Sequence, residues 1–284
     1  MSAASRVIPI IDQGTAYGRP QPTSMRELAE VGPGTPMGEL LRRYWHPIGL
    51  VSDATDRPRK VRVLGEDLIL FRDKSGRVGL LYPHCAHRGT SLYYGKVDEH
   101  GIRCCYHGWQ FDVQGHCLHQ PCEPGGGRAR EAKRQPWYPV QEQYGLIWAY
   151  MGPPERKPAL PRYECLEQLG EGEFLEADDS SIGGGGPQII PCNWLQCQEN
   201  TVDPVHFEWL HNNVQQRAAG DQGVYSPRTL KMAIEDRPWG LPSRRYREGK
   251  PILFVMNFTA EPKEVRLNSG RRDLLSRQKE IGRA

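Results

Sequence analysis

The sequence predicts an α+β protein, in which a mostly β N-terminal domain precedes a domain of mixed helices and strands. Short runs of β-branched and aromatic residues, each ending in a loop, recur between about residues 40 and 155 and indicate strands. A connector rich in Pro, Glu and Gly follows at 155–190. After it, residues 193–200 lack Pro and Gly and favour a helix, whereas PILFVMNF at 251–258 favours a strand. We therefore divide the chain into an arm at 1–35, a first domain at 36–155 and a second at 156–284.

The composition is that of a globular chain, with 284 residues, 38% of them hydrophobic and 25% charged. A net charge of +3 is too small to favour a nucleic-acid partner or a polyanionic surface. The chain begins without a signal peptide pattern, and no apolar run approaches the roughly 20 residues that span a bilayer. We expect a cytoplasmic protein that binds neither nucleic acid nor membrane. In that compartment its eight cysteines indicate metal ligands and free thiols.

Capping and turn residues predict the first elements in order. TPMGELLRRYWHP predicts a helix, because Thr35 can cap it, Pro36 suits its first position and Pro47 lies beyond its end. KVRVLGEDLILFRD predicts a hairpin that turns at residues 65–67. GRVGLLYPHC and GIRCCYHGWQFD continue the pattern of short strands that end in loops, and YGLIWAYMGPP at 144–154 predicts a strand that ends at its Gly-Pro-Pro.

Two of these loops each carry a cysteine and a histidine. Cys85 and His87 form a C-x-H pair, and Cys104 and His107 form a C-x2-H pair within RCCYHGW. The residues leave three interpretations open, namely a core or disulfide group, a closed tetrahedral zinc site, or a Rieske [2Fe–2S] cluster. The cluster requires one thiolate and one imidazole from each loop, and glycines beside both pairs let the backbone approach its sulfurs. The pattern favours the cluster.

The motifs CAHRGTSL and CCYHGWQFD resemble the Rieske domains of ring-hydroxylating oxygenases over about residues 35–155. Rieske proteins of the respiratory-complex type carry two further cysteines, at positions that Thr90 and Tyr106 occupy here. Cys105 occupies a position where the family often has proline, and we interpret it as a free thiol. The resemblance implies four cluster ligands: Cys85, His87, Cys104 and His107. The remaining candidates show no spacing of a second such set: His84, His100, His116, His119, Cys117, Cys122 and Cys165.

A second constellation lies in QENTVDPVHFEWLH, where Asp203, His206 and His211 form a D-x2-H-x4-H pattern. Two histidines and a carboxylate form the facial triad of non-haem Fe(II) oxygenases. Positions five apart on a regular helix point about 140° from each other, so both histidines reach one metal only if the helix is distorted between them. On the pattern alone, a helix-capping Asp203 and an interfacial histidine remain an alternative.

The longer segment NWLQCQENTVDPVHFEWLH resembles the start of the catalytic domain in the same oxygenases, and the chain as a whole resembles their phthalate-dioxygenase-like branch. The resemblance implies that His206 and His211 bind a mononuclear Fe(II), and that Asp203 carries electrons from the Rieske histidine of a neighbouring subunit. It also implies homotrimers or homohexamers. The family's third iron ligand is an aspartate far downstream, and no acidic residue after His211 lies in such a context. We therefore expect an incomplete catalytic domain, an antiparallel sheet with helices, over 156–284.

Two functional hypotheses follow. The first is the oxygenase component of a multicomponent NAD(P)H-dependent system, in which a flavin- and ferredoxin-type reductase supplies electrons and a small aromatic compound is hydroxylated or demethylated with O2. The chain has no G-x-G-x-x-G fingerprint, so the nicotinamide site belongs to another protein. The second is a Rieske-type electron-transfer or assembly module that lacks oxygenase activity because its catalytic domain is incomplete.

Overall fold

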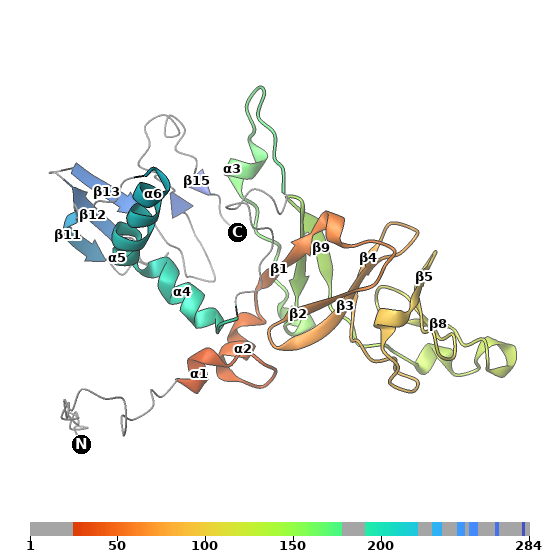
Figure 1. Cartoon of the computed structure of the whole chain (residues 1–284). Coiled ribbons are helices and arrows are strands. Elements are labelled where there is room, and N and C mark those ends of the chain that lie inside the picture. The colour runs from red at the N-terminus through yellow and green to blue at the C-terminus, as the bar shows by residue number, and fades with distance from the viewer. Residues whose placement is uncertain are drawn as a thin grey trace, which may run out of the picture.

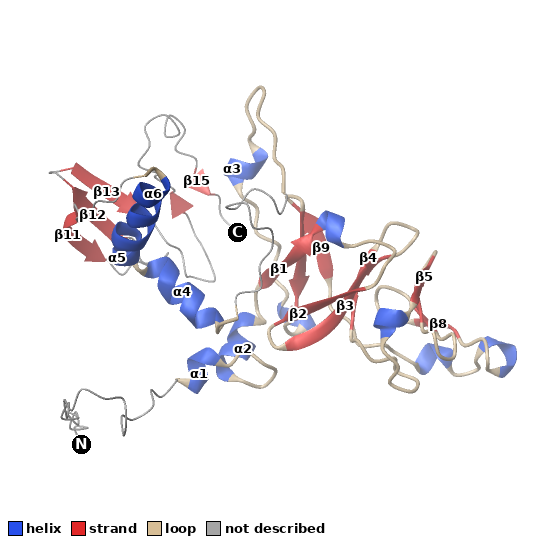
Figure 2. Cartoon of the chain, in the orientation of Figure 1, coloured by secondary structure: helices blue, strands red, loops and turns tan. Residues whose placement is uncertain are grey.

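The computed structural model describes residues 25–177, 191–220, 229–234, 243–247, 250–254, 265–266 and 280–281. Strands and loops dominate up to Tyr150, and the later helices lead away from them to a separate small sheet (Figure 1, Figure 2). This arrangement confirms the predicted α+β class. Most of the predicted arm lies outside the described residues, and its described end contains the short helix α1, Arg26–Ala29.

Helix α2, Pro36–Leu41, begins as its capping residues predict. The Thr35 side chain accepts the backbone N–H of Gly38 at 3.2 Å, and proline occupies the first turn. Directly after the helix, the buried guanidinium of Arg42 pairs with Glu66 at 2.5 Å. This ion pair fastens the end of the helix to the first hairpin of the β-rich part.

Two three-stranded antiparallel sheets form the scaffold of the β-rich part. Their strand orders are β1–β10–β9 (Trp45–Leu50, Leu146–Tyr150, Val140–Gln143) and β2–β3–β4 (Arg59–Val63, Glu66–Arg72, Val78–Leu81). The facing side chains of both sheets form one apolar core: Ala54, Val63, Leu68, Leu70, Leu80, Ile147, Ala149 and Met151. The sheets therefore pack face to face as a small sandwich.

The turn between β2 and β3 is tighter than the sequence predicted. Leu64 and Gly65 have φ values of 44° and 80°, as in the type I′ turns that match the twist of a hairpin. Glu66 and Asp67 consequently begin β3, where they pair with Val63 and Arg62, instead of lying in the turn. The predicted turn at 65–67 was wrong by about one residue.

Strand β3 is buried on both faces. Leu68 and Leu70 point into the sandwich core, whereas Ile69 and Phe71 point to the opposite side, because successive side chains of a strand alternate. On that opposite side they join a second core: Leu81, Cys85, Leu92, Val97, Ile102, Cys104, Trp109, Phe111 and Cys117. One central strand therefore supports both the scaffold and the segment that carries the predicted cluster ligands.

That segment is built on a four-stranded antiparallel sheet in the order β5–β6–β7–β8. Its strands are short, and most of the segment is loop (Figure 2). The strands are Lys96–Asp98, Gly101–Arg103, Gln110–Phe111 and Cys117–His119, and short 3₁₀ turns lie at Val51–Asp53, Leu92–Tyr94, Pro124–Gly126, Arg130–Ala132 and Pro154–Arg156. Short strands with long loops suit a segment whose loops hold ligands.

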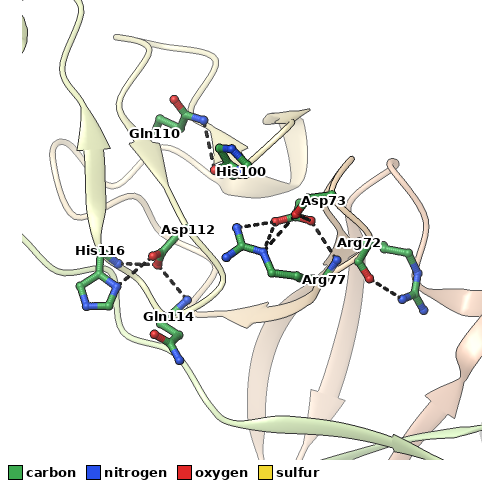
Figure 3. Close-up of polar contacts among 10 residues, drawn as sticks. Arg72, Asp73, Arg77, His100, Gln110, Asp112, Gln114 and His116 are labelled. Atoms are coloured by element: carbon green, nitrogen blue, oxygen red, sulfur yellow. Dashed lines mark hydrogen bonds and ion pairs between the residues drawn. The ribbon is translucent and has the colours of Figure 1, made fainter.

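The turn between β3 and β4 links the scaffold to this four-stranded sheet. Buried Asp73 accepts hydrogen bonds from Ser75 and from the backbone and guanidinium of Arg77, at 2.7 to 3.0 Å (Figure 3). The N–H of Lys74 donates to the carbonyl of Asp98 at 3.1 Å. Burial alone would raise the pKa of Asp73, but hydrogen bonds from Ser75 and Arg77 hold it below its ordinary value.

The later half contains several helices and an antiparallel sheet in the order β11–β12–β13. Asn193 caps α4 by accepting the N–H of Leu195 at 3.0 Å, and its amide donates to Ala29 of α1 at 2.7 Å. The elements are α3 Glu164–Glu167, α4 Trp194–Val202, α5 Pro204–His206, η6 Phe207–His211, α6 Asn212–Ala218, β11 Thr229–Ile234, β12 Ser243–Arg247, β13 Lys250–Phe254, β14 Val265–Arg266 and β15 Glu280–Ile281. Within the described parts, none of the helices has the length and apolar character to cross a bilayer.

Candidate functional site

Cys85 and Cys104 open two loops that share one backbone turn. In each loop, the glycine four residues after the cysteine donates its N–H to the cysteine carbonyl, at 2.9 Å for Gly89 and 3.1 Å for Gly108. The N–H of each cysteine donates to the carbonyl five residues later, at 2.9 and 2.8 Å. Both glycines have φ near +70°, which other residues rarely adopt. Two loops of the same geometry therefore leave β4 and β6.

The loops bring the two cysteines together and the two histidines together. Cys85 and Cys104 are each only 3% exposed and pack in the same core, where each thiol adds to the electrostatic surroundings of the other. The rings of His87 and His107 are half-buried, with centroids 4.7 Å apart. Burial raises the pKa of Cys85 to about 11, whereas burial and the neighbouring His107 lower the pKa of His87. The thiols therefore lie inside and the imidazoles at the rim.

Aromatic side chains orient both histidines. The indole of buried Trp109 stacks parallel to His87, with centroids 4.4 Å apart and an interplanar angle of 0°. The exposed ring of Tyr106 lies 3.8 Å from His107 at 41°. Each imidazole is thus packed against one aromatic ring.

Each loop also forms hydrogen bonds with a polar side chain that was not singled out from the sequence. Gln135 is fully buried, accepts the N–H of Ala86 at 2.8 Å and donates to two carbonyls of the first loop. Arg103 donates to the carbonyl of Gly108 in the second loop at 2.8 Å. The ligand loops are therefore fixed by hydrogen bonds to their backbones.

The cysteines and histidines that we placed outside the metal sites have other surroundings. Cys105 is exposed, and Cys117 is buried in the apolar core beneath the loops. His116 pairs with Asp112 at 2.9 Å (Figure 3), and His119 contacts Arg103. These positions agree with their assignment, which remains a prediction.

The second histidine pair lies on a distorted helix. Residues Phe207–His211 form a π-helical turn between α5 and α6. A π turn closes over five residues, so residues five apart come to lie on the same face. The rings of His206 and His211 are accordingly 5.3 Å apart. The helix distortion that the spacing required is present.

Asp203 lies beside this pair. One carboxylate oxygen accepts the N–H of Val205 at 2.7 Å, as in a helix cap, and the other lies 3.6 Å from Nδ1 of His206. This Nδ1 is buried and has no hydrogen-bond partner among the described residues. Asp203 therefore both caps the helix and faces His206. In the described part of the chain, no three or more His, Cys, Asp or Glu side chains are grouped as ligands of one metal ion.

Comparison with known proteins finds one domain family and several similar proteins. Residues 44–139 match the family model of the Rieske [2Fe-2S] domain. The chain is 58% identical over 219 residues to phenoxybenzoate dioxygenase subunit alpha of Ectopseudomonas oleovorans, covering 73% of this chain and 53% of that protein. It is 46% identical over 226 residues to the 5,5'-dehydrodivanillate O-demethylase oxygenase subunit of Sphingobium sp., covering 78% and 51%. The chain therefore carries a Rieske [2Fe-2S] domain and is similar, over about half of their length, to oxygenase subunits that act with such a domain.

The fold is similar to that of a solved structure. The structure matches dicamba monooxygenase bound to 3,6-dichlorosalicylic acid with a TM-score of 0.54, at 24% identity, over 72% of this chain and 55% of that one. The chain spans about half the length of the curated relatives it matches.

The two pairs of side chains fit the [2Fe–2S] cluster of a Rieske domain. Such a cluster takes thiolates on one iron and imidazoles on the other, and the loops present the thiols and the imidazoles as separate pairs. A lowered pKa keeps His87 neutral, which is its ligating form. The buried thiols are deprotonated when a metal binds them. The family match favours this cluster over the closed zinc site.

Proposed function

We propose that this chain carries the Rieske domain and the first part of the catalytic domain of an oxygenase component, with the boundary near residue 155. Cys85, His87, Cys104 and His107 would hold the [2Fe–2S] cluster, and His206 and His211 would bind a mononuclear Fe(II). The observation that carries the proposal is the π-helical turn, because it brings two histidines five residues apart onto one face. An ordinary surface helix does not need this distortion.

The two metal groups would divide the chemistry. When bound, the cluster supplies electrons one at a time, and the Fe(II) supplies the position at which O2 reacts. The residues of the chain orient these groups. Trp109 fixes the ring plane of His87, and Asp203 faces His206 from 3.6 Å, where its carboxylate can accept the imidazole N–H.

Electrons would pass between subunits. Figure 1 shows the α5–α6 helices and the β5–β8 sheet at opposite ends of the chain, so one chain does not bring its own two histidine pairs together. A homotrimer or homohexamer in which Asp203 of one subunit meets the Rieske histidines of another would close this gap. We also propose a cytoplasmic system in which a flavin- and ferredoxin-type reductase delivers electrons from NAD(P)H.

The substrate proposed is a small aromatic compound. The names of two relatives specify a phenoxybenzoate and an O-demethylation. Both names concern ether oxygens on aromatic compounds. Aromatic ethers are therefore the first substrates to test, with hydroxylation or demethylation as the reaction.

Iron counting distinguishes this proposal from an electron-transfer module without oxygenase activity. We expect about three irons per chain after reconstitution, two in the cluster and one at the histidine pair. His206→Ala should lose about one iron and leave the EPR signal of the reduced cluster unchanged. Equal iron contents in the variant and the unchanged chain would support the module.

A further inference from the structure

Gln135 contacts the first ligand loop through every polar atom of its side chain. Its Oε1 accepts the N–H of Ala86 at 2.8 Å, and its Nε2 donates to the carbonyls of Tyr82 at 2.8 Å and His84 at 2.9 Å. The side chain is 0% exposed, although glutamine is rarely buried completely. Loss of this amide would leave three part-buried backbone groups of one loop without their partner.

The backbone of Gln135 is itself held on both sides. Its N–H donates to the carbonyl of Gly115 at 2.8 Å, and the next carbonyl, of Pro136, accepts the N–H of Tyr82 at 2.9 Å. Gly115 has φ +73°, and a Cβ added there would lie 1.9 Å from the carbonyl oxygen of Gln135. The amide is therefore presented to the loop from a fixed position.

The position of Ala86 makes this contact important for the cluster. Ala86 is the residue between the proposed ligands Cys85 and His87, in a backbone stretch whose neighbouring N–H groups, those of His87 and Arg88, reach the Cys85 thiol. Backbone N–H groups beside the ligands can donate to cluster sulfurs. Such hydrogen bonds stabilise the reduced, more negative cluster and raise its reduction potential. By accepting the N–H of Ala86, Gln135 fixes the peptide from which the first histidine extends, and this N–H would become free to turn toward a cluster sulfur only if Gln135 were replaced.

We propose that Gln135 is a positioning residue that sets the reduction potential of the cluster through the Cys85–Ala86–His87 backbone. The inference rests on the proposed ligand assignment. Gln135 touches neither a predicted ligand side chain nor a reacting atom, and it acts through the backbone of the loop alone.

The test compares three variants of the reconstituted full chain. Gln135→Leu removes all three contacts. Gln135→Glu keeps an acceptor for the Ala86 N–H, and as a protonated acid in this buried site it also keeps one donor. Gln120→Leu is the matched control, because Gln120 is also buried, at 3% exposed, but lies outside both ligand loops, where its backbone N–H donates to the carbonyl of Gly126. The readouts are a potentiometric titration, the EPR g-values and hydrogen exchange of the peptide spanning residues 82–87.

At a fixed solution potential, we expect Gln135→Leu to raise the ratio of reduced to oxidised cluster about tenfold, which corresponds to a reduction potential higher by 59 mV for one electron. The EPR g-values should shift, and the backbone amides of residues 82–87 should exchange faster. Gln135→Glu should retain the exchange protection and the g-values of the unchanged chain. The proposal is overturned if Gln135→Leu leaves the potential and the exchange unchanged, or if Gln120→Leu shifts them equally.

If Gln135→Leu does not retain the cluster, Gln135→Glu decides the question. Protected exchange and unchanged g-values in that variant support the proposal, and unprotected exchange contradicts it. Failure of the ligand assignment is recognised separately, because Cys104→Ser would then keep the cluster whatever Gln135 does.

Discussion

The two histidine pairs of this chain lie in very different surroundings. His87 and His107 sit on two loops that are anchored to a buried core and held by side chains from other strands. His206 and His211 sit on a helix whose neighbouring apolar side chains, Trp209 among them, are exposed in the described structure. Asp203 beside them is also exposed.

The comparison shows two ways of building a metal site. The first pair lies on two loops that repeat one turn and that are hydrogen-bonded by side chains from other parts of the domain. The second pair is positioned only by the local winding of its own helix. We therefore expect the first site to be lost mainly when a ligand is replaced, and the second to be lost also through small changes in its surroundings.

The largest expected effect is the loss of the cluster, which should differ between substitutions at two adjacent cysteines. Cys104→Ser should lose the cluster, because it removes a buried thiol paired with Cys85. Cys105→Ser should keep it, because that side chain is exposed and outside the turn contacts. Visible absorbance and iron content after purification distinguish the two. A cluster that survives Cys104→Ser but not Cys105→Ser would reverse the assignment.

At the second pair, Asp203→Asn should slow electron delivery while both metal groups remain bound. The amide keeps the shape and the helix cap but loses the charge that faces His206. Changes of such partners of metal-binding histidines typically cost 10–100-fold, so single-turnover transfer should fall about tenfold or more. An unchanged rate of electron transfer in stopped-flow measurements would contradict the bridging role of Asp203.

A smaller effect, on stability, is expected at Asp73 in the turn between β3 and β4. Asp73→Asn should lower the free energy of unfolding by about 2 kcal/mol at pH 7, because buried hydrogen bonds to a charged group are lost. The folded-state pKa of Asp73 is lowered, so its stabilisation is present above its unfolded pKa and is lost as the pH falls through the folded value.

The difference between the variant and the unchanged chain should therefore shrink below about pH 4. Urea unfolding at several pH values measures it. Asp67→Asn is the control, because Asp67 forms an exposed ion pair with Arg62, which contributes little. Equal effects of the two substitutions at pH 7 would contradict this account of the junction.

Local features of the fold were predictable from the sequence, and distant ones were not. The cap at Thr35 and each Cys–His pair follow from residues a few positions apart, and the approach of the two pairs followed from the need of one cluster for ligands from both loops. The need for a distorted helix between His206 and His211 followed from helix geometry, although the π form did not. The hairpin turn was misplaced because Leu64 adopts a φ that side chains rarely do.

Gln135 shows why the remainder was missed. It lies 49 residues from the Ala86 N–H that it accepts, in a stretch without a metal-binding motif. Its role depends on the register of strands far apart in the sequence. The burial of β3 on both faces could not be predicted for the same reason. A run of apolar residues does not show which of the two cores each side chain enters.

The ligand set of the cluster is the central claim, and pulsed EPR of the reduced chain tests it most directly. The account predicts strongly coupled nitrogen from both His87 and His107, with the coupling from His107 lost selectively in a His107→Cys variant that still holds a cluster. A reduced cluster without directly bound nitrogen, or a colourless protein that holds zinc, would contradict it.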